Sequence, residues 1–145
     1  ERMQARWFGA HPGILEWHQR TEHNLETTRS VTNAFGFVRT YYDRIDAILP
    51  EALAWIPQST VAIVINTGLN NAFADKLLSR YHEILIQVHD SVAGQYVTAQ
   101  EAFVLPRLHQ HFLVTIPYSD PLIIPVGLKT STESWGACKG KAWPK

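Results

Sequence analysis

The sequence has little cysteine and no excess of either charge, and both features exclude classes of protein. Cys138 is the only cysteine in 145 residues, so the chain alone can form neither an internal disulfide nor a zinc site built from cysteines. A reducing, cytoplasmic setting is therefore expected. The 13 basic residues equal the 13 acidic ones. This balance argues against a free-standing nucleic-acid-binding domain, which usually carries a basic excess.

Long hydrophobic runs are lacking as well. The longest uncharged apolar run lies around Val61–Ile65, far short of the roughly 20 residues that span a membrane. No signal-peptide pattern opens the chain, so we expect no membrane association. The chain begins with Glu1 and has Met3 as its only methionine, which we interpret as a trimmed product or a piece of something longer.

The composition is nevertheless that of a folded domain, since 46% of the residues are hydrophobic and 11% are aromatic. We expect a single segment over residues 1–145, because the chain is long enough for one domain and too short for two. Apolar residues at helical spacing predict a helix over residues 13–28. The β-branched and aromatic residues from Val31 to Tyr42 predict a short hairpin.

A second helix is expected from Pro50, where proline suits a first turn. Pro57 predicts an interruption, because proline removes a backbone donor and clashes with the preceding turn. The helix then resumes over residues 58–65, where it is apolar nearly all round and must be buried, here or against a partner.

The second half of the chain predicts strands. Residues 83–88 and 92–96 predict an antiparallel pair. A capping-box pattern at residues 98–101 predicts a helix that ends near Phe112, and residues 121–127 predict a short strand with prolines at its ends. Helices followed by a strand hairpin, a helix and a strand indicate an α+β fold.

The junction between the two predicted strands is the first candidate site. Asp90 follows His89 at the tip, where a carboxylate projects into solvent from a rigid base and suits a hard cation such as Mg²⁺. Aspartate is also common in turns for purely structural reasons. The pattern of these two residues alone leaves both interpretations open.

A second candidate site follows Pro57. The side chain of Gln58 both donates and accepts hydrogen bonds, so it suits the acceptors on minor-groove base edges. Ser59 and Thr60 follow it, and the alternative is a polar cluster at a helix start. Arg39 lies among the aromatic residues of the first hairpin, an interleaving that nucleic-acid surfaces often show. His109 and His111 direct their rings apart on a helix and form no metal pair.

Five short motifs occur in an order that resembles the C-terminal part of a family A DNA polymerase, most of all the phage-borne members. Their order covers roughly residues 5–138. The motifs are Arg6-Trp7-Phe8 with His11-Pro12-Gly13-Ile14-Leu15-Glu16-Trp17, Phe35-Gly36-Phe37-Val38-Arg39, Pro57-Gln58-Ser59-Thr60-Val61-Ala62, Gln87-Val88-His89-Asp90-Ser91, and Ile124-Pro125-Val126-Gly127 with Ser134-Trp135-Gly136.

The resemblance implies an incomplete polymerase palm: an antiparallel hairpin with a flanking helix and a closing strand. It implies a post-fingers helix and hairpin over residues 1–48, the palm over 49–138 and a tail over 139–145. The reaction it implies is two-metal transfer of a deoxynucleotide onto a primer 3′-hydroxyl. Asp90 would bind Mg²⁺ and His89 would lie near the primer terminus. Gln58, Ser59, Thr60 and Arg39 would contact DNA.

The resemblance also implies partners. The second catalytic carboxylate and the nucleotide-binding helix would precede Glu1, so activity requires an N-terminal polymerase segment or chain, with primer-template DNA and deoxynucleoside triphosphates. We expect the Val61–Ile65 helix to dock on that segment. A phage-encoded enzyme would work in the cytoplasm of its bacterial host.

Three departures from the family pattern favour an alternative. Ser91 replaces a glutamate, Ala54 an asparagine and Pro50 an arginine. A non-catalytic DNA- or protein-binding module that retains the palm fold is the alternative function. A third interpretation, an unrelated metal-dependent hydrolase using Asp90 with Glu83 or Asp120, lacks a second carboxylate at convincing spacing.

Overall fold

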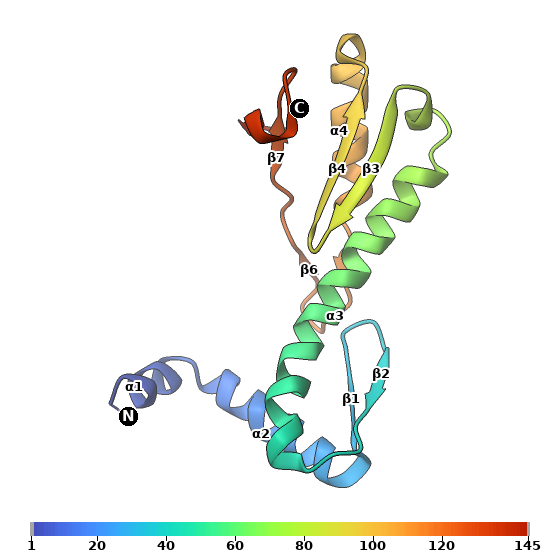
Figure 1. Cartoon of the computed structure of the whole chain (residues 1–145). Coiled ribbons are helices and arrows are strands. Elements are labelled where there is room, and N and C mark those ends of the chain that lie inside the picture. The colour runs from blue at the N-terminus through green and yellow to red at the C-terminus, as the bar shows by residue number, and fades with distance from the viewer. Residues whose placement is uncertain (1, 145) are drawn as a thin grey trace. The chain divides into compact units, whose positions relative to one another are not determined.

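The protein has an α+β fold, as the sequence predicts (Figure 1). A computed structural model describes residues 2–144, and within them are four α-helices and four two-stranded antiparallel hairpins. The chain divides into two compact units, Glu1–Thr60 and Val61–Lys145. The predicted subdivision at residues 48 and 138 stays a prediction.

The first unit begins with two helices and a hairpin. Its elements are α1 (Arg2–Ala10), α2 (Pro12–Thr28), β1 (Ser30–Thr32), β2 (Val38–Thr40) and the first part of α3 (Ile45–Ala74). The helix predicted over residues 13–28 is confirmed as α2. Arg29, which follows its last residue, has a left-handed backbone (φ 58°) that suits a helix C-terminus. The sequence analysis did not predict α1.

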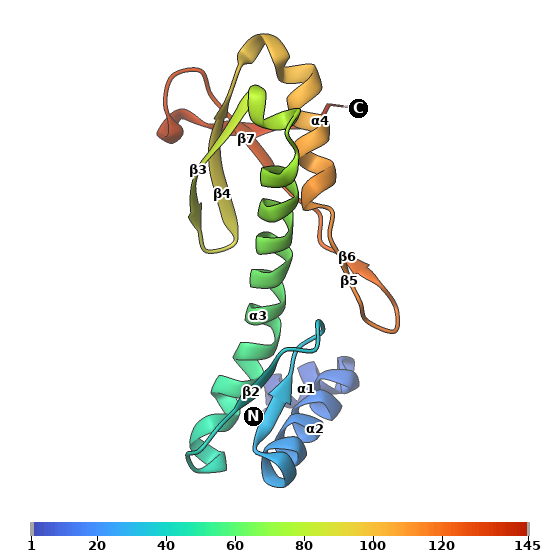
Figure 2. The same ribbon diagram turned by 90° about the vertical axis from the view of Figure 1, so that its right-hand side faces the viewer.

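The predicted hairpin is confirmed as β1 and β2, which pair Val31 opposite Arg39. Figure 2 shows it beside α2 and the first turns of α3. A small core joins these elements, with Leu25 from α2, Val31 and Tyr41 from the hairpin region, and Ile48 and Ala52 from α3. Burial of these side chains holds a hairpin that is too short to be stable alone.

The interruption expected at Pro57 is wrong, because α3 runs as one helix through both Pro50 and Pro57. A proline inside a helix costs roughly 3 kcal/mol, so the surroundings must offset it. Ala52 and Thr60, on either side of Pro57, are 0% and 2% exposed. Tertiary burial along α3 therefore outweighs the local preference of the prolines to break it.

Among the described helices, α3 is long and apolar enough to cross a membrane by length and composition alone. The core helix of a soluble protein meets the same criterion. The Val61–Ile65 run is the part of α3 that the sequence predicts to be apolar nearly all round. Val64 and Ile65 are buried within the chain, whereas Ala62 is exposed. The described residues therefore cover only part of this segment, and burial of the rest against a partner stays a prediction.

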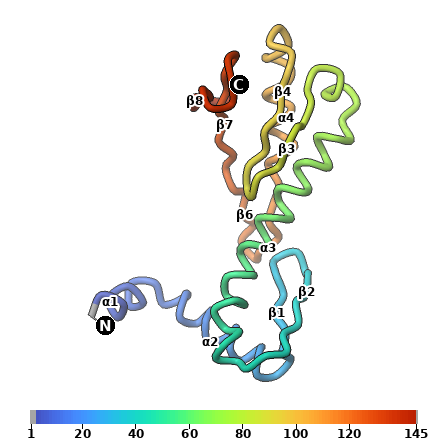
Figure 3. Tube along the Cα trace, in the orientation of Figure 1, coloured from blue at the N-terminus to red at the C-terminus, as the bar shows by residue number. Residues whose placement is uncertain are grey.

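The second unit contains the rest of α3, three hairpins and α4. Its elements are η1 (Leu78–Arg80), β3 (His82–Val88), β4 (Ser91–Tyr96), η2 (Thr98–Gln100), α4 (Glu101–Phe112), β5 (Thr115–Ile116), β6 (Leu122–Ile123), β7 (Leu128–Thr130), η3 (Trp135–Ala137) and β8 (Lys139–Lys141). Figure 3 follows the chain from the β3–β4 hairpin through α4 to the β7–β8 hairpin.

The strand pair predicted from residues 83–96 is confirmed as β3 and β4. Its inner face packs on a core that includes Leu78, Val104 and Phe112, through Ile84 and Val92. The strand predicted over residues 121–127 is confirmed only as the two residues of β6. Proline at 121 and 125 leaves no backbone donor at either side of β6.

The capping box predicted at residues 98–101 is wrong. Thr98–Gln100 forms a 3-10 turn, and α4 begins without a side-chain cap. The carboxylate of Glu101 instead accepts a hydrogen bond from Tyr96 Oη at 2.8 Å and pairs with Lys141. The Glu101 carboxylate is therefore bound to Tyr96 and Lys141 and does not cap the start of α4.

Candidate functional site

The β3–β4 hairpin places His89 and Asp90 together at its tip. Val88 pairs with Ser91, so only these two residues form the loop. His89 has φ 53°, in the left-handed region that favours glycine and asparagine. The tip is therefore tight, and its backbone conformation is costly for the residue that occupies it.

Polar contacts stabilise the tip without using the aspartate. Ser91 Oγ donates a hydrogen bond to the Val88 carbonyl oxygen at 2.8 Å. Gln87 Nε2 lies 3.4 Å from the His89 carbonyl oxygen. His89 and Asp90 are both exposed. Within residues 2–144 the Asp90 carboxylate makes no hydrogen bond or ion pair, so it is free to bind a ligand.

The base of the hairpin is fixed by Tyr96. Burial, together with the hydrogen bond to Glu101, raises the pKa of Tyr96 to about 12. The Lys141 ammonium holds the pKa of Glu101 below its usual value. At Gly94, an added Cβ would lie 2.5 Å from the carbonyl oxygen of Glu83. The two strands therefore approach closely where they meet the core, and the tip projects from a rigid base.

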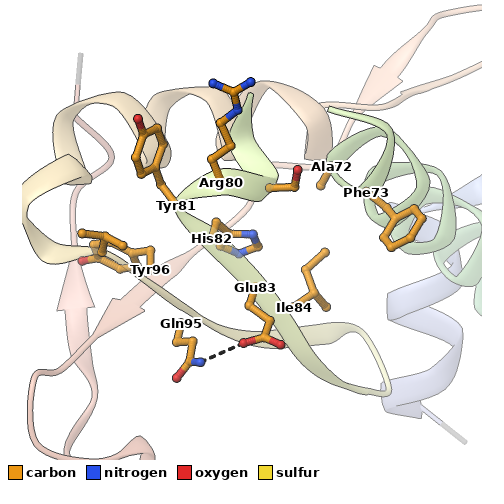
Figure 4. Close-up of a pocket in the computed structure, with 11 residues that line it drawn as sticks. Ala72, Phe73, Arg80, Tyr81, His82, Glu83, Ile84, Gln95 and Tyr96 are labelled. Carbon is orange, nitrogen blue, oxygen red and sulfur yellow. Dashed lines mark hydrogen bonds between the residues drawn. The ribbon is translucent and has the colours of Figure 1, made fainter. Parts of the chain in front are cut away.

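An open depression of about 650 Å³ lies at this base (Figure 4). His82 and Glu83 from β3 face Gln95 and Tyr96 from β4, and Gln95 Nε2 donates to Glu83 Oε2 at 2.9 Å. Burial lowers the pKa of His82. Glu83 lies six strand positions from His89, roughly 20 Å along the strand, so the depression does not include the tip.

The residues predicted to contact DNA differ in the solvent exposure of their side chains. Gln58 is exposed, whereas Ser59 is half-buried and Thr60 is only 2% exposed. Thr60 Oγ1 donates to the Ile56 carbonyl oxygen at 2.8 Å. Arg39 forms an ion pair with Glu51 of α3 and lies 4.9 Å from the ring centre of Tyr41. Of these four, only Gln58 has an exposed side chain without a hydrogen-bond partner among residues 2–144.

A polar cluster around Asp75 was not predicted from the sequence. Asp75, at the end of α3, forms an ion pair with Arg107 and a 2.8 Å contact between its Oδ2 and Nε2 of His111. Its other oxygen accepts the backbone amides of Leu77 and Leu78 at 3.1 Å. Arg107 and then His111 hold the pKa of Asp75 well below its usual 3.8. The i, i+4 spacing of Arg107 and His111 was the one signal in the sequence.

The rings of His109 and His111 do point to different partners, as their spacing predicts. His109 stacks on Trp143, with ring centres 4.4 Å apart and planes 6° apart. Trp143 Nε1 donates to the Val126 carbonyl oxygen at 2.7 Å. His109 therefore anchors the C-terminal segment on α4, while His111 binds the end of α3.

No group of three histidine, cysteine, aspartate or glutamate side chains in residues 2–144 is arranged to hold a metal ion. Glu83, one alternative partner for Asp90, is engaged with Gln95 at the base of the hairpin. Asp90 thus supplies one carboxylate, and a stable Mg²⁺ site at the tip needs further oxygen ligands from elsewhere.

No protein family, no curated protein and no solved structure matches the chain.

Proposed function

We propose that the chain is the C-terminal palm-and-fingers part of a family A DNA polymerase and contributes one metal-binding aspartate, Asp90, to nucleotidyl transfer. The observation that carries the proposal is the placement of His89 and Asp90. They form the whole loop of an antiparallel hairpin whose base packs on α4. The ordered motifs around this hairpin supply the identity of the reaction.

The backbone at the tip supports a functional role. A non-glycine residue in the left-handed region costs about 1 kcal/mol, and such outliers concentrate at functional sites. A glycine or asparagine would satisfy the turn with less strain. His89 and Asp90 are both exposed at this turn, so the tip presents an imidazole and a carboxylate to solvent.

The chemistry assigned to the tip requires a metal. Two Mg²⁺ ions supply the positive charge that stabilises the attacking and leaving oxygens of such a displacement. Asp90 fits this role as an exposed carboxylate without an internal partner. Because residues 2–144 provide no cluster of three ligands, the second carboxylate comes, in this proposal, from an N-terminal polymerase segment or chain.

The proposed contact with the primer-template centres on Gln58. Its amide can donate to the minor-groove acceptors that all correct base pairs share, so it tests pair geometry without reading sequence. Arg39 is engaged with Glu51 and holds β2 on α3, and Thr60 is buried. In the proposal these residues, with Ser59, position the contact surface, and α3 serves as a core helix of a cytoplasmic enzyme.

Primer extension with Mg²⁺ and deoxynucleoside triphosphates tests the proposal. We expect no activity from the chain alone and activity after assembly with its N-terminal segment. Asp90→Ala should abolish extension by the assembly, while Asp120→Ala, an exposed aspartate between β5 and β6, should not. Retained extension by Asp90→Ala would remove Asp90 from the catalytic role.

A non-catalytic binding module is the second candidate, and the side chain of Ser91 favours it. Ser91 occupies a position next to Asp90 where a carboxylate would add a ligand, and its hydroxyl donates to Val88 instead. DNA binding by the assembly without any extension would establish this function in place of the polymerase.

A further inference from the structure

Asn33 is a buried polar residue to which the proposed reaction gives no role. Its side chain is 5% exposed, and it occupies the start of the turn between β1 and β2. A buried amide is expected to satisfy its donors and acceptors. Asn33 does so by joining two segments that are 26 positions apart along the chain.

The oxygen end of the amide organises the turn. Asn33 Oδ1 accepts the backbone amides of Phe35 and Phe37, both at 3.0 Å. The backbone closes the same turn, since Asn33 N donates to the Phe37 carbonyl oxygen at 2.9 Å and Gly36 N donates to the Asn33 carbonyl oxygen at 3.0 Å. Gly36 has φ 84°, which the tight turn requires.

The nitrogen end of the amide reaches α3. Asn33 Nδ2 donates to Ser59 Oγ at 3.0 Å, and Ser59 Oγ donates to the Ile56 carbonyl oxygen at 3.2 Å. The direction of this chain of bonds is fixed, because two backbone donors on one side demand the amide oxygen there. Ser59 immediately follows Gln58, so the turn is bonded to the residue next to the proposed minor-groove contact.

The helix departs from its regular hydrogen-bond pattern at this position. Pro57 has no backbone N–H, so the helical hydrogen bond that it would make is missing. Ile56, just before it, has its carbonyl oxygen bonded by the hydroxyls of both Ser59 and Thr60. Hydroxyls bonded back to the helix bend it locally. The helical backbone on either side of Gln58 is thus held partly by side-chain hydrogen bonds.

We propose that Asn33 is a positioning residue that, through Ser59, sets the orientation of Gln58 toward the nascent base pair. This inference rests on the proposed polymerase function. The Asn33–Ser59 bond transmits the position of the β1–β2 turn to Gln58, and neither Asn33 nor Ser59 touches the DNA. Discrimination against a mispaired primer end depends on this bond.

The test measures kcat/KM for extension of matched and mismatched primers by the assembled protein. Ser59→Ala removes the inter-segment bond but leaves both turn bonds of Asn33. We expect it to lower the ratio of kcat/KM for matched primers to kcat/KM for mismatched primers by about 3- to 10-fold. This factor corresponds to the free energy of one buried hydrogen bond. Ser59→Thr keeps a hydroxyl and should restore the ratio.

A double-mutant cycle separates positioning from a merely structural effect. In a Gln58→Ala background, Ser59→Ala should change the ratio no further, because the group that it positions is already absent. Additive effects of the two substitutions would overturn the inference, as would an unchanged ratio in Ser59→Ala alone.

The failure of the proposed function has a different signature. Extension that survives Asp90→Ala, or no extension by the wild-type assembly, overturns the polymerase and the inference with it. A second outcome overturns the positioning role alone. In it, the wild-type assembly extends primers normally, Asp90→Ala abolishes extension, and Ser59→Ala leaves the matched-over-mismatched ratio unchanged. If Ser59→Ala folds poorly, Asn33→Asp, which keeps the acceptor and removes the donor, takes its place with the same expected ratio.

Discussion

Nε2 of His111 lies 2.8 Å from Oδ2 of Asp75, and this contact joins α4 to the end of α3 within the second unit. Arg107 binds the same oxygen from the preceding turn of α4. The side chain of Asp75 is only 7% exposed. The cluster therefore fixes the helix against which the β3–β4 hairpin packs.

The first prediction concerns the pH dependence of this cluster. Asp75→Asn keeps the size of the side chain and removes its charge, so it should lower the free energy of unfolding at pH 7. The folded pKa of Asp75 lies below the unfolded value of 3.8. Its contribution is thus fully present above that value and is lost as the pH falls toward the folded pKa.

Urea denaturation of wild type and Asp75→Asn between pH 7 and pH 2.5 measures this. The difference in midpoint should be constant near neutrality and shrink below pH 4. Asp46→Asn is the matched control, because Asp46 and Arg44 form an exposed pair of 71% and 87% exposure that should contribute little. Equal effects of the two substitutions would contradict the prediction.

The second prediction concerns Gly68, where α3 meets the end of α4. An added Cβ would lie 2.4 Å from Cδ1 of Phe112, and Phe112 belongs to the core of the second unit. Gly68→Ala should therefore destabilise the fold by about 1–3 kcal/mol through overpacking, although alanine is the better helix former. Thermal denaturation followed by circular dichroism measures the loss.

Gly13→Ala in α2 supplies the control, because no atom lies within 4 Å of its added Cβ. It should leave stability unchanged or slightly raised. Phe112→Leu, combined with Gly68→Ala, should recover part of the loss by removing the ring. A Gly68→Ala protein as stable as wild type would show that α3 and α4 are less closely packed than described.

The third prediction uses Tyr41, whose buried hydroxyl has no hydrogen-bond partner in the described residues. Burial raises the pKa of Tyr41, consistent with a phenol removed from water. Tyr41→Phe deletes the unsatisfied oxygen and should increase the free energy of unfolding by about 1 kcal/mol. Chemical denaturation measures it, and a loss of stability would indicate a partner for the hydroxyl.

The sequence predicted the first hairpin, α2 and the β3–β4 hairpin because local patterns determine them. The alternation of apolar residues predicts the strands, Gly36 predicts the turn of the first hairpin, and Pro12 precedes the helical spacing of α2. Each of these signals lies within a few residues of the element that it predicts. The continuity of α3 through Pro57 was not predictable in this way, because the burial of Ala52 and Thr60 that offsets the proline comes from distant segments.

In the candidate site, too, local features were predictable from the sequence and contacts between distant residues were not. The pairing of His89 with Asp90 at a hairpin tip followed from two adjacent strand patterns. The bonds of Asp75 to Arg107 and His111 join residues 32 and 36 positions apart. The i, i+4 spacing places Arg107 and His111 on one helix face, but no local pattern identifies Asp75 as their partner. Thr60 was a candidate for DNA contact because it follows Gln58 and Ser59 in the sequence, whereas its side chain is buried in the structure.

The fourth prediction links the base of the β3–β4 hairpin to its tip. Gly94→Ala places a Cβ 2.5 Å from the Glu83 carbonyl oxygen, so the strands must separate, at a cost of about 1–3 kcal/mol. Hydrogen exchange at the β3 amides should accelerate. Gly127→Ala, with nothing within 4 Å, should leave that exchange unchanged, and equal exchange in both variants would contradict the prediction.

The most direct test of the central claim is the single-turnover rate of nucleotide incorporation by the assembled protein carrying Asp90→Asn. This substitution keeps the shape of the hairpin tip and removes one metal-binding charge. We expect the rate to fall about a thousandfold or more, because several kcal/mol of charge stabilisation are lost, with unchanged affinity for primer-template DNA. An incorporation rate within a few-fold of wild type would contradict the assignment of Asp90.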